Sequence, residues 1–290
     1  MAPGPFCVRR RRGVAFEVRR IPRGAERLYS GAAGRFAEGM KKVLLVLTST
    51  DDMSGTPTGY TLSEAAHPWK VFRDAGYFVD FASIAGGQPP QDGKDEEDEV
   101  QRQYLEDETV RASLYNTPRI SVVDPAQYDA VYLVGGHGTM WDFAGNADLQ
   151  ALVADVHDAG GVVGAVCHGP AGLVDVELAN GLRIVEGRRV AAFTNAEEDE
   201  VGKSDVVPFL LEDKLVEQGA DVRTAPNWTE NVVVDDRLVT GQNPQSAAGV
   251  AKEMTKLLTE VVREQKAAQE ADSAALRQAH DAEKSEDAEG

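Results

Sequence analysis

The most constraining feature of this sequence is an apolar run that ends at an adjacent cysteine and histidine. The run Val162–Val166 leads directly into Cys167 and His168, and the small residues Ala165 and Gly169 stand within two positions of the cysteine. A strand that turns abruptly into a helix needs small neighbours, because the strained turn leaves no room for larger side chains. The segment therefore predicts a nucleophile elbow that carries Cys in place of the usual Ser.

The chemistry of such an elbow follows from the place where it holds the thiol. At the N-terminus of the next helix, the helix dipole favours the thiolate form of Cys167. His168 can supply a base or a charged partner, and the amides of the turn can bind an oxyanion. The alternative is a buried structural cysteine beside a capping histidine. The small residues around the pair favour the catalytic interpretation.

Short apolar runs alternate with longer amphipathic segments through most of the chain, a pattern typical of an α/β domain. Several runs are apolar without alternation, as expected for strands of a mostly parallel sheet with helices on both faces. Strands are predicted at Val43–Leu47, Val79–Ala82, Val131–Val134, Val162–Val166, Arg189–Phe193, Val232–Val234 and Leu238–Thr240, and helices at Leu62–Ala75, Ala147–Ala159 and Pro208–Gln218.

Composition divides the chain into three parts. Residues 1–39 are basic and lack an apolar stretch of signal-peptide length, which predicts a disordered extension, with an organelle-targeting peptide as the alternative. Residues 40–262 are predicted to form the catalytic domain, with Met40 as the natural start of the folded part. Residues 263–290 form an acidic polar tail, helical or disordered. The acidic stretch Asp92–Val110 is expected to be a solvated insertion.

Charge and cysteine content exclude several classes of protein. The chain has 48 Asp and Glu against 30 Lys and Arg, a net charge of −18 that disfavours nucleic acid and anionic membrane surfaces as partners. No apolar run approaches the roughly 20 residues of a membrane helix. The two cysteines, Cys7 and Cys167, cannot build a disulfide framework, so we predict a protein of the reducing cytoplasm.

Functional groups of a parallel sheet gather at the carboxyl ends of its strands. After the strand predicted at Val131–Val134, Gly135, Gly136 and Gly138 surround His137. Glycines let a backbone approach a ligand closely, and their amides can form an oxyanion hole or anion nest. A plain tight turn is the alternative. We expect His137 to be a pocket wall or a hydrogen-bond partner rather than a catalyst.

A second junction places an acid in apolar surroundings. Glu64 lies four residues before Pro68 in an otherwise apolar helical segment. Because proline has no N–H, the segment should start or kink at Pro68. A carboxyl group among Leu62, Ala65 and Ala66 is poorly solvated, which raises its pKa and suits it to carry a proton near a thiol. An exposed acid in an ordinary first turn is the alternative.

A third junction is acidic. Glu197, Glu198, Asp199 and Glu200 follow the strand predicted at Arg189–Phe193, and one of them is a candidate to orient the histidine of the elbow. A solvated acidic loop is the alternative for this stretch.

Taken together, these residues resemble the ThiJ/PfpI superfamily, the cysteine-elbow branch of the class I glutamine amidotransferase-like fold. The likeness covers about residues 41–260 and is greatest to the glutathione-independent glyoxalase (glyoxalase III) group, also described as a heat-shock chaperone group. It implies a flavodoxin-like three-layer sandwich. The motifs that carry it are Ser63–Ala65 with His67 and Pro68, Gly136–Thr139, Ala165–Pro170, Phe193–Thr194 with Glu198, and Leu238–Ser246.

The resemblance assigns roles to individual residues. It implies Cys167 as nucleophile, His168 and Glu198 as the rest of a triad, and Glu64 as proton carrier, with Glu197 as a rival for the triad acid. Oxyanion and substrate contacts are assigned to Gly136, His137, Gly138 and Gly169. Neither His67 nor His137 falls in a chelating spacing, so we expect no metal and no cofactor.

The activity implied is that of a glyoxalase III-type lyase (D-lactate dehydratase). Methylglyoxal or another small 2-oxoaldehyde would add to Cys167 as a hemithioacetal and leave as D-lactate or another 2-hydroxy acid, without glutathione. A stress-response holdase chaperone or redox sensor that uses Cys167 is one alternative. An amidase or peptidase of the same superfamily is another, and a homodimer is left open.

Overall fold

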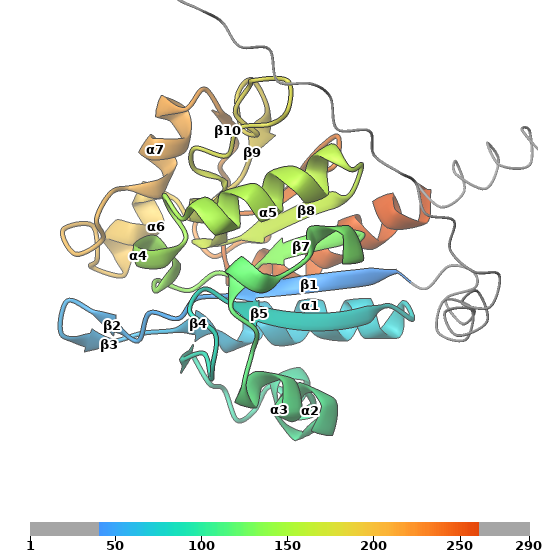
Figure 1. The fold of residues 1–290 in the computed structure, drawn as a ribbon. Coiled ribbons are helices and arrows are strands. Elements are labelled where there is room, and N and C mark those ends of the chain that lie inside the picture. The colour runs from blue at the N-terminus through green and yellow to red at the C-terminus, as the bar shows by residue number, and fades with distance from the viewer. Residues whose placement is uncertain (1–40, 261–290) are drawn as a thin grey trace, which may run out of the picture. The chain divides into compact units, whose positions relative to one another are not determined.

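A six-stranded sheet forms the centre of the computed structural model, which describes residues 41–260 (Figure 1). The strands lie in the order β11-β12-β8-β7-β1-β5, and every neighbouring pair is parallel except the β11–β12 hairpin. This arrangement confirms the predicted flavodoxin-like α/β fold. The strands are β1 (Lys42–Leu47), β5 (Phe78–Ser83), β7 (Ala130–Leu133), β8 (Val162–Val166), β11 (Val232–Asp235) and β12 (Leu238–Gly241).

Helices cover both faces of the sheet, and short strand pairs lie outside it. The helices are α1 (Leu62–Asp74), α2 (Glu99–Glu106), α3 (Glu108–Tyr115), α4 (Thr139–Asp142), α5 (Ala147–Asp158), α6 (Asn195–Glu200), α7 (Leu211–Glu217) and residues 247–260. The 3₁₀ turns are η1 (Ile120–Val122), η2 (Pro125–Gln127), η3 (Gly169–Leu173) and η4 (Pro244–Ser246). The short strands are β2 (Asp52–Met53), β3 (Thr56–Pro57), β4 (Tyr60–Thr61), β6 (Gln91–Asp92), β9 (Arg189–Val190) and β10 (Asp221–Val222).

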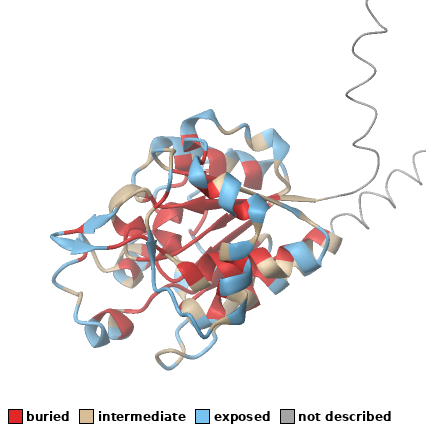
Figure 2. Cartoon of the chain, turned by 90° about the horizontal axis from the view of Figure 1, so that it is seen from below, coloured by how far each residue is buried: buried red, intermediate tan, exposed pale blue. Residues whose placement is uncertain are grey.

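The core consists of two apolar layers, one on each face of the sheet (Figure 2). Successive side chains of a strand point to opposite faces, and in β1 Leu44 and Val46 join the layer beneath α5, whereas Leu45 and Leu47 join the layer beneath α1. All four side chains are fully buried. Burial of a leucine stabilises the fold by about 1.5–3 kcal/mol, so these layers fix the positions of the strand ends.

The strand predicted at Arg189–Phe193 is mostly wrong. Only Arg189–Val190 is extended, and it pairs with β10 instead of joining the central sheet. The amide of Ala191 donates to the hydroxyl of Thr240 at 2.8 Å, and the amide of Phe193 donates to the carbonyl of Cys167 at 2.9 Å. These contacts take the place of a regular ladder and tie the segment to the elbow.

The helical predictions are confirmed in place but not in detail. Helix α5 matches within one residue, and α7 begins at Leu211, three residues later than predicted. Helix α1 begins at Leu62 and continues through Pro68, so the proline does not start the helix.

The acidic stretch Asp92–Val110 is not only a solvated insertion. It forms α2 and the start of α3, and Tyr104 is fully buried with its ring edge-on to Trp69 at 5.5 Å. Much of its acidity serves local structure, because Asp98 and Asp107 accept backbone hydrogen bonds as N-caps of the two helices.

The basic extension at residues 1–39, Met40 and the tail at residues 263–290 lie outside the described residues. Among residues 41–260, none of the helices has the length and apolar character to cross a membrane.

The turn after β7 gives a stability test of the fold. At Gly136, with φ of 109°, an added Cβ would lie 2.7 Å from the amide nitrogen of Thr61, whereas at Gly76, with φ of 81°, it would meet nothing within 4 Å. We expect Gly76→Ala to lower the free energy of unfolding by about 1 kcal/mol through backbone strain alone. Gly136→Ala should lower it by about 2–4 kcal/mol, because a collision is added. Urea unfolding measures both, and equal losses would contradict the close packing at Gly136.

Candidate active site

The cysteine elbow is present and strained. Cys167 has φ of 58°, in the left-handed region that side chains other than glycine rarely adopt. Its amide donates to the carbonyl of Gly241 at 2.9 Å, which ties the turn to β12. A Cβ on Gly169 would collide with the carbonyl oxygen of Leu133. Such strain, of order 1–3 kcal/mol, persists only where the surroundings enforce it.

The state of the thiol differs from the sequence-based expectation. The segment after the elbow is the 3₁₀ turn η3, so no long helix directs its dipole at the sulfur. Cys167 is 3% exposed. Burial first, and the neighbouring Glu64 carboxylate second, raise the pKa of the Cys167 thiol well above its ordinary value. The prediction that the helix dipole favours a thiolate is therefore wrong, and the protonated thiol is the resting form.

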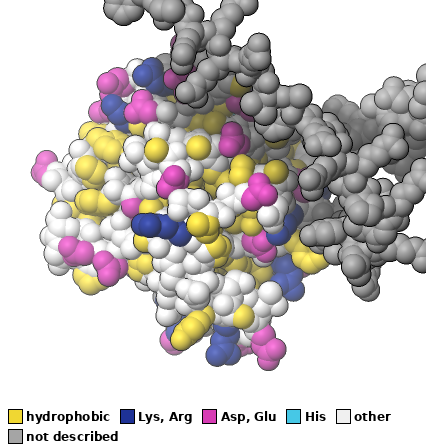
Figure 3. All heavy atoms as spheres, viewed as in Figure 1, with side chains coloured by type: hydrophobic (Ala, Val, Ile, Leu, Met, Phe, Trp, Pro, Cys, Tyr) yellow, Lys and Arg dark blue, Asp and Glu magenta, His cyan; other side chains and the backbone are white. Residues whose placement is uncertain are grey.

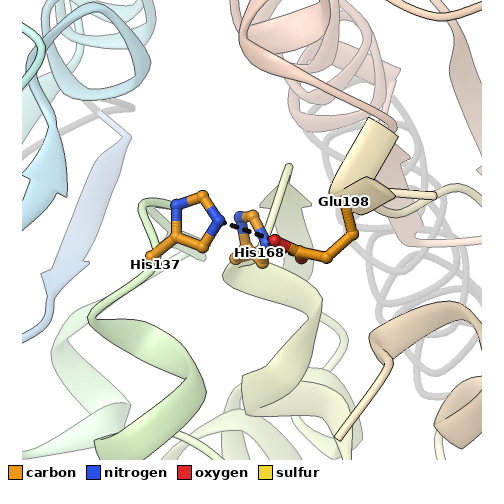
Figure 4. A group of neighbouring side chains, drawn as sticks. All are labelled: His137, His168 and Glu198. Carbon is orange, nitrogen blue, oxygen red and sulfur yellow. Dashed lines mark hydrogen bonds and ion pairs between the residues drawn. The ribbon is translucent and has the colours of Figure 1, made fainter. Parts of the chain in front are cut away.

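His168 connects the thiol to an acid. Its Nδ1 lies 3.3 Å from the sulfur of Cys167, and its Nε2 lies 2.8 Å from Oε2 of Glu198 (Figure 4). Burial and the nearby His137 lower the pKa of His168 to about 4, so the ring is neutral at pH 7. Because a carboxylate can only accept, Nε2–H donates to Glu198 and the lone pair of Nδ1 faces the thiol.

His137 is a second donor to the same carboxylate. Its Nε2 lies 2.9 Å from Oε1 of Glu198, and its ring centroid lies 4.1 Å from that of His168 (Figure 4). Phe193 packs near the same ring of His168, at 4.3 Å. Although burial opposes ionisation, the hydrogen bonds from His137 and His168 lower the pKa of Glu198 to about 2. His137 is therefore a hydrogen-bond partner of Glu198.

Glu198, rather than Glu197, contacts the histidine of the elbow. Glu197 is fully buried and points to the other side, where it joins the start of α6 to two further loops. It accepts hydrogen bonds from the amides of Thr194 and Trp228, the hydroxyl of Thr194, and the side-chain amides of Gln242 and Asn243. Glu197 thus holds neighbouring loops together. Gln242 and Asn243 of the Leu238–Ser246 motif are two of its hydrogen-bond donors.

Glu64 is the acid nearest to the thiol. Its side chain is fully buried, and neither carboxyl oxygen has a hydrogen-bond partner of ordinary geometry among the described residues. A Cβ on Gly135 would collide with Oε2 of Glu64 and lie 3.0 Å from Cβ of Cys167, which places the three residues together. Burial raises the pKa of Glu64 from 4.5 to about 8, against an opposing effect of Cys167. Glu64 is therefore mostly protonated at pH 7.

The glycines predicted to bind substrate fall into two groups. The amide of Gly136 donates to no backbone carbonyl in the described part of the chain, so it is a candidate oxyanion donor, whereas the amide of His168 already donates to the sulfur of Cys167. Gly138 packs against Thr48, and Gly169 packs against the carbonyl of Leu133, so close packing accounts for both. A substrate contact at Gly138 or Gly169 stays a prediction.

Sequence reasoning paired His168 with Glu198 but missed that His137 joins them. One ligand atom from each lies within 4.8 Å of the others, a set with metal-binding chemistry. A search for chelating spacing cannot find it, because the three residues follow different strands. The available signal was that His137 and His168 each lie just past the end of a strand, β7 and β8.

Comparison with known proteins places this site in a family. A family model described as the DJ-1/PfpI family matches residues 56–257. The chain belongs to the DJ-1/PfpI family. The resemblance to ThiJ/PfpI proteins is thereby confirmed, including the likeness to the glyoxalase III group.

Relatives of this DJ-1/PfpI protein carry glyoxalase names. It is 34% identical over 235 residues to "Glyoxalase 3" of Candida albicans, covering 74% of this chain and 97% of that protein. It is 34% identical over 232 residues to "Glutathione-independent glyoxalase HSP31" of Saccharomyces cerevisiae, covering 73% and 95%.

Solved structures agree with this placement. The crystal structure of glyoxalase III from Candida albicans has a TM-score of 0.69 at 34% identity, covering 75% of this chain and 97% of that chain. The Rapid Encystment Protein of Francisella tularensis has a TM-score of 0.73 at 42% identity, covering 76% and 99%.

The buried acid gives a test by stability. A carboxyl whose pKa is about 8 when folded and 4.5 when exposed holds an extra proton in the folded state between these values. The free energy of unfolding should therefore decrease as pH rises from about 4.5 to 8. Glu64→Gln removes this loss, so it should stabilise the protein at pH 7.5 by about 1–3 kcal/mol and by much less at pH 4.5. Thermal and urea unfolding at both pH values measure this. A variant less stable at pH 7.5, or a difference independent of pH, would show that Glu64 is not a protonated buried acid.

Proposed function

We propose that this protein is a glutathione-independent glyoxalase that converts methylglyoxal to D-lactate at Cys167. The observation that carries the proposal is a buried, protonated Glu64 next to an elbow cysteine whose base is the neutral His168. The names of the relatives from Candida albicans and Saccharomyces cerevisiae support the same chemistry.

The first step uses the thiol and its histidine. As the sulfur of Cys167 attacks the aldehyde carbon, its proton moves to Nδ1 of His168, 3.3 Å away. Glu198 stabilises the resulting imidazolium through the hydrogen bond at Nε2. The oxyanion formed from the aldehyde accepts a hydrogen bond from the amide of Gly136 and takes the proton of Glu64, which gives a neutral hemithioacetal and a Glu64 carboxylate.

The second step moves a proton between two carbons. The carboxylate of Glu64 then removes the hydrogen from the carbon bonded to sulfur, while the imidazolium of His168 gives its proton to the neighbouring carbonyl oxygen, and an enediol forms. Glu64 delivers the hydrogen to the adjacent carbon, His168 takes up the hydroxyl proton of the carbon bonded to sulfur, and the adduct becomes the thioester of a 2-hydroxy acid. A carboxyl with a pKa raised to about 8 by burial suits this task, because it gives and takes protons readily near neutral pH.

The last step is hydrolysis. Water adds to the thioester, and the 2-hydroxy acid leaves as the thiol is restored. Methylglyoxal plus water equals lactate in atoms and electrons, so the cycle needs no external oxidant or reductant. One face of the adduct must receive the new hydrogen, and this determines the chirality of the product.

The other functions considered from the sequence have less support in this geometry. A peroxide sensor needs an exposed thiolate, whereas Cys167 is 3% exposed with a raised thiol pKa that burial causes. A holdase needs a continuous apolar surface, and the one face drawn in Figure 3 does not supply it, because its apolar side chains are dispersed between polar ones. Acyl transfer in an amidase has no evident use for a protonated Glu64.

Turnover of methylglyoxal without glutathione tests the proposal. The wild-type protein should form D-lactate, detected with stereospecific lactate dehydrogenases, and Cys167→Ala should form none. Glu64→Gln should lower kcat by about 10²–10⁴-fold, because general acid–base catalysis is lost. Asp74→Asn, an exposed acid at the end of the same helix, serves as the matched control and should leave kcat unchanged. Full turnover by Cys167→Ala would remove the covalent mechanism, and full turnover by Glu64→Gln would remove the proton carrier.

A further inference from the structure

Two imidazoles and one carboxylate lie close together in Figure 4, and one of the imidazoles, that of His168, contacts the thiol of Cys167. Nε2 of His137 and Nε2 of His168 lie 2.9 and 2.8 Å from the two oxygens of Glu198. The ligand atoms of the three residues all lie within 4.8 Å of one another. Three side chains from three segments thus present the donor set of two histidines and one carboxylate.

This donor set suits a divalent transition ion. Zn²⁺ binds imidazole nitrogen and carboxylate oxygen at about 2.0–2.2 Å, and sites with three protein ligands leave a fourth position open. In a tetrahedral site with bonds of that length, ligand atoms lie about 3.4 Å apart. The two nitrogen–oxygen contacts would therefore widen by roughly half an ångström, which small side-chain rotations can supply.

Packing holds the three side chains in place, and that of His137 is partly exposed. The ring of His168 packs against the rings of His137 and Phe193, with centroids 4.1 and 4.3 Å away. The side chains of His168 and Glu198 are 1% and 4% exposed, whereas that of His137 is 18% exposed. An ion can therefore reach the group past His137, and the net charge of −18 attracts cations toward the protein.

We propose that His137, His168 and Glu198 form a binding site for a divalent transition-metal ion, with Zn²⁺ as the reference case, and that the bound ion blocks the reaction of Cys167. The bound ion would block the reaction of Cys167 because Nε2 and Nδ1 belong to the same imidazole ring of His168. When Nε2 of His168 binds the ion, its proton moves to Nδ1, which then donates toward the sulfur and can no longer accept the thiol proton. No electron is transferred, and Glu198 needs no change in protonation.

The binding half of this proposal stands without any activity, whereas the block depends on the proposed function. Binding is therefore measured first, in Cys167→Ala, where the sulfur cannot act as a ligand. Calorimetry with Zn²⁺ should show one site, and Co²⁺ should give visible absorption typical of tetrahedral coordination. His137→Asn and Glu198→Gln, each in the same background, should weaken Zn²⁺ binding at least about tenfold, as expected on loss of one ligand.

A matched control separates this site from weak binding by other histidines. His67 pairs with Asp98 at the surface, with 34% of its side chain exposed, so His67→Asn should leave the affinity unchanged. Absence of a single-site Zn²⁺ isotherm in Cys167→Ala would overturn the metal site. Equal affinity in folded His137→Asn and Glu198→Gln would overturn it too, as would weaker binding in His67→Asn. Circular dichroism verifies that each variant is folded.

Turnover then tests the block in the wild-type protein. Zn²⁺ at concentrations that fill the site should inhibit methylglyoxal conversion at least about tenfold, and a chelator should restore it. Turnover that continues with the site filled would overturn the block and leave the proposed function intact. If the wild-type protein shows no turnover without metal, the proposed function fails, and the block fails with it, while the binding result stands.

Discussion

The close burial of Glu64 and Cys167 is the interaction on which the rest of the site depends. Two acidic groups buried side by side do not both ionise readily, because each negative charge lacks water and repels the other. Burial raises the pKa of Glu64 to about 8, and burial with Glu64 raises that of Cys167. At neutral pH the pair therefore keeps its protons. Under the proposed function, the thiol needs a base to react, and His168, with Nδ1 3.3 Å from the sulfur, is placed to serve as that base.

The scaffold explains how this pair is held. Strand β8 is flanked by β7 and β12, and the turn after it is tied to Gly241 through the amide of Cys167. Helix α1 starts immediately after β4, so Glu64 enters the core in the first turn of the helix. Gly135, in the turn after β7, leaves the space into which its carboxyl fits. Backbone strain at the elbow and burial of the acid are both stabilised by the apolar layers around them.

Much of the fold could be predicted, because parallel strands buried on both faces leave continuous apolar runs in the sequence. The runs at β1, β7 and β8 are of this kind. The elbow could be predicted for a different reason, because its tight turn requires small residues near Cys167. The strand predicted at Arg189–Phe193 was mostly wrong, because its backbone amides donate to Thr240 and Cys167. These contacts join residues far apart in the sequence, so the local sequence pattern does not indicate them. The thiol was expected to be ionised, since the sequence shows a helix signal but not the depth of burial.

The site was predictable one residue at a time, and its geometry was not. Each strand end pointed to its own candidate, yet the choice between Glu197 and Glu198 depends on which carboxyl the first turn of α6 directs at His168. The contact of His137 with Glu198 joins residues 61 positions apart. Such contacts are set by strand order, and the sequence records strand order only indirectly.

Infrared spectroscopy of the substrate-free protein tests the central claim most directly. The difference between wild type and Glu64→Gln should contain the carbonyl band of a protonated carboxylic acid at pH 7, and this band should disappear as pH rises through about 8. A spectrum that shows only the carboxylate of Glu64 at pH 7 would contradict the account, because the thiol would then face a fixed negative charge instead of a proton donor.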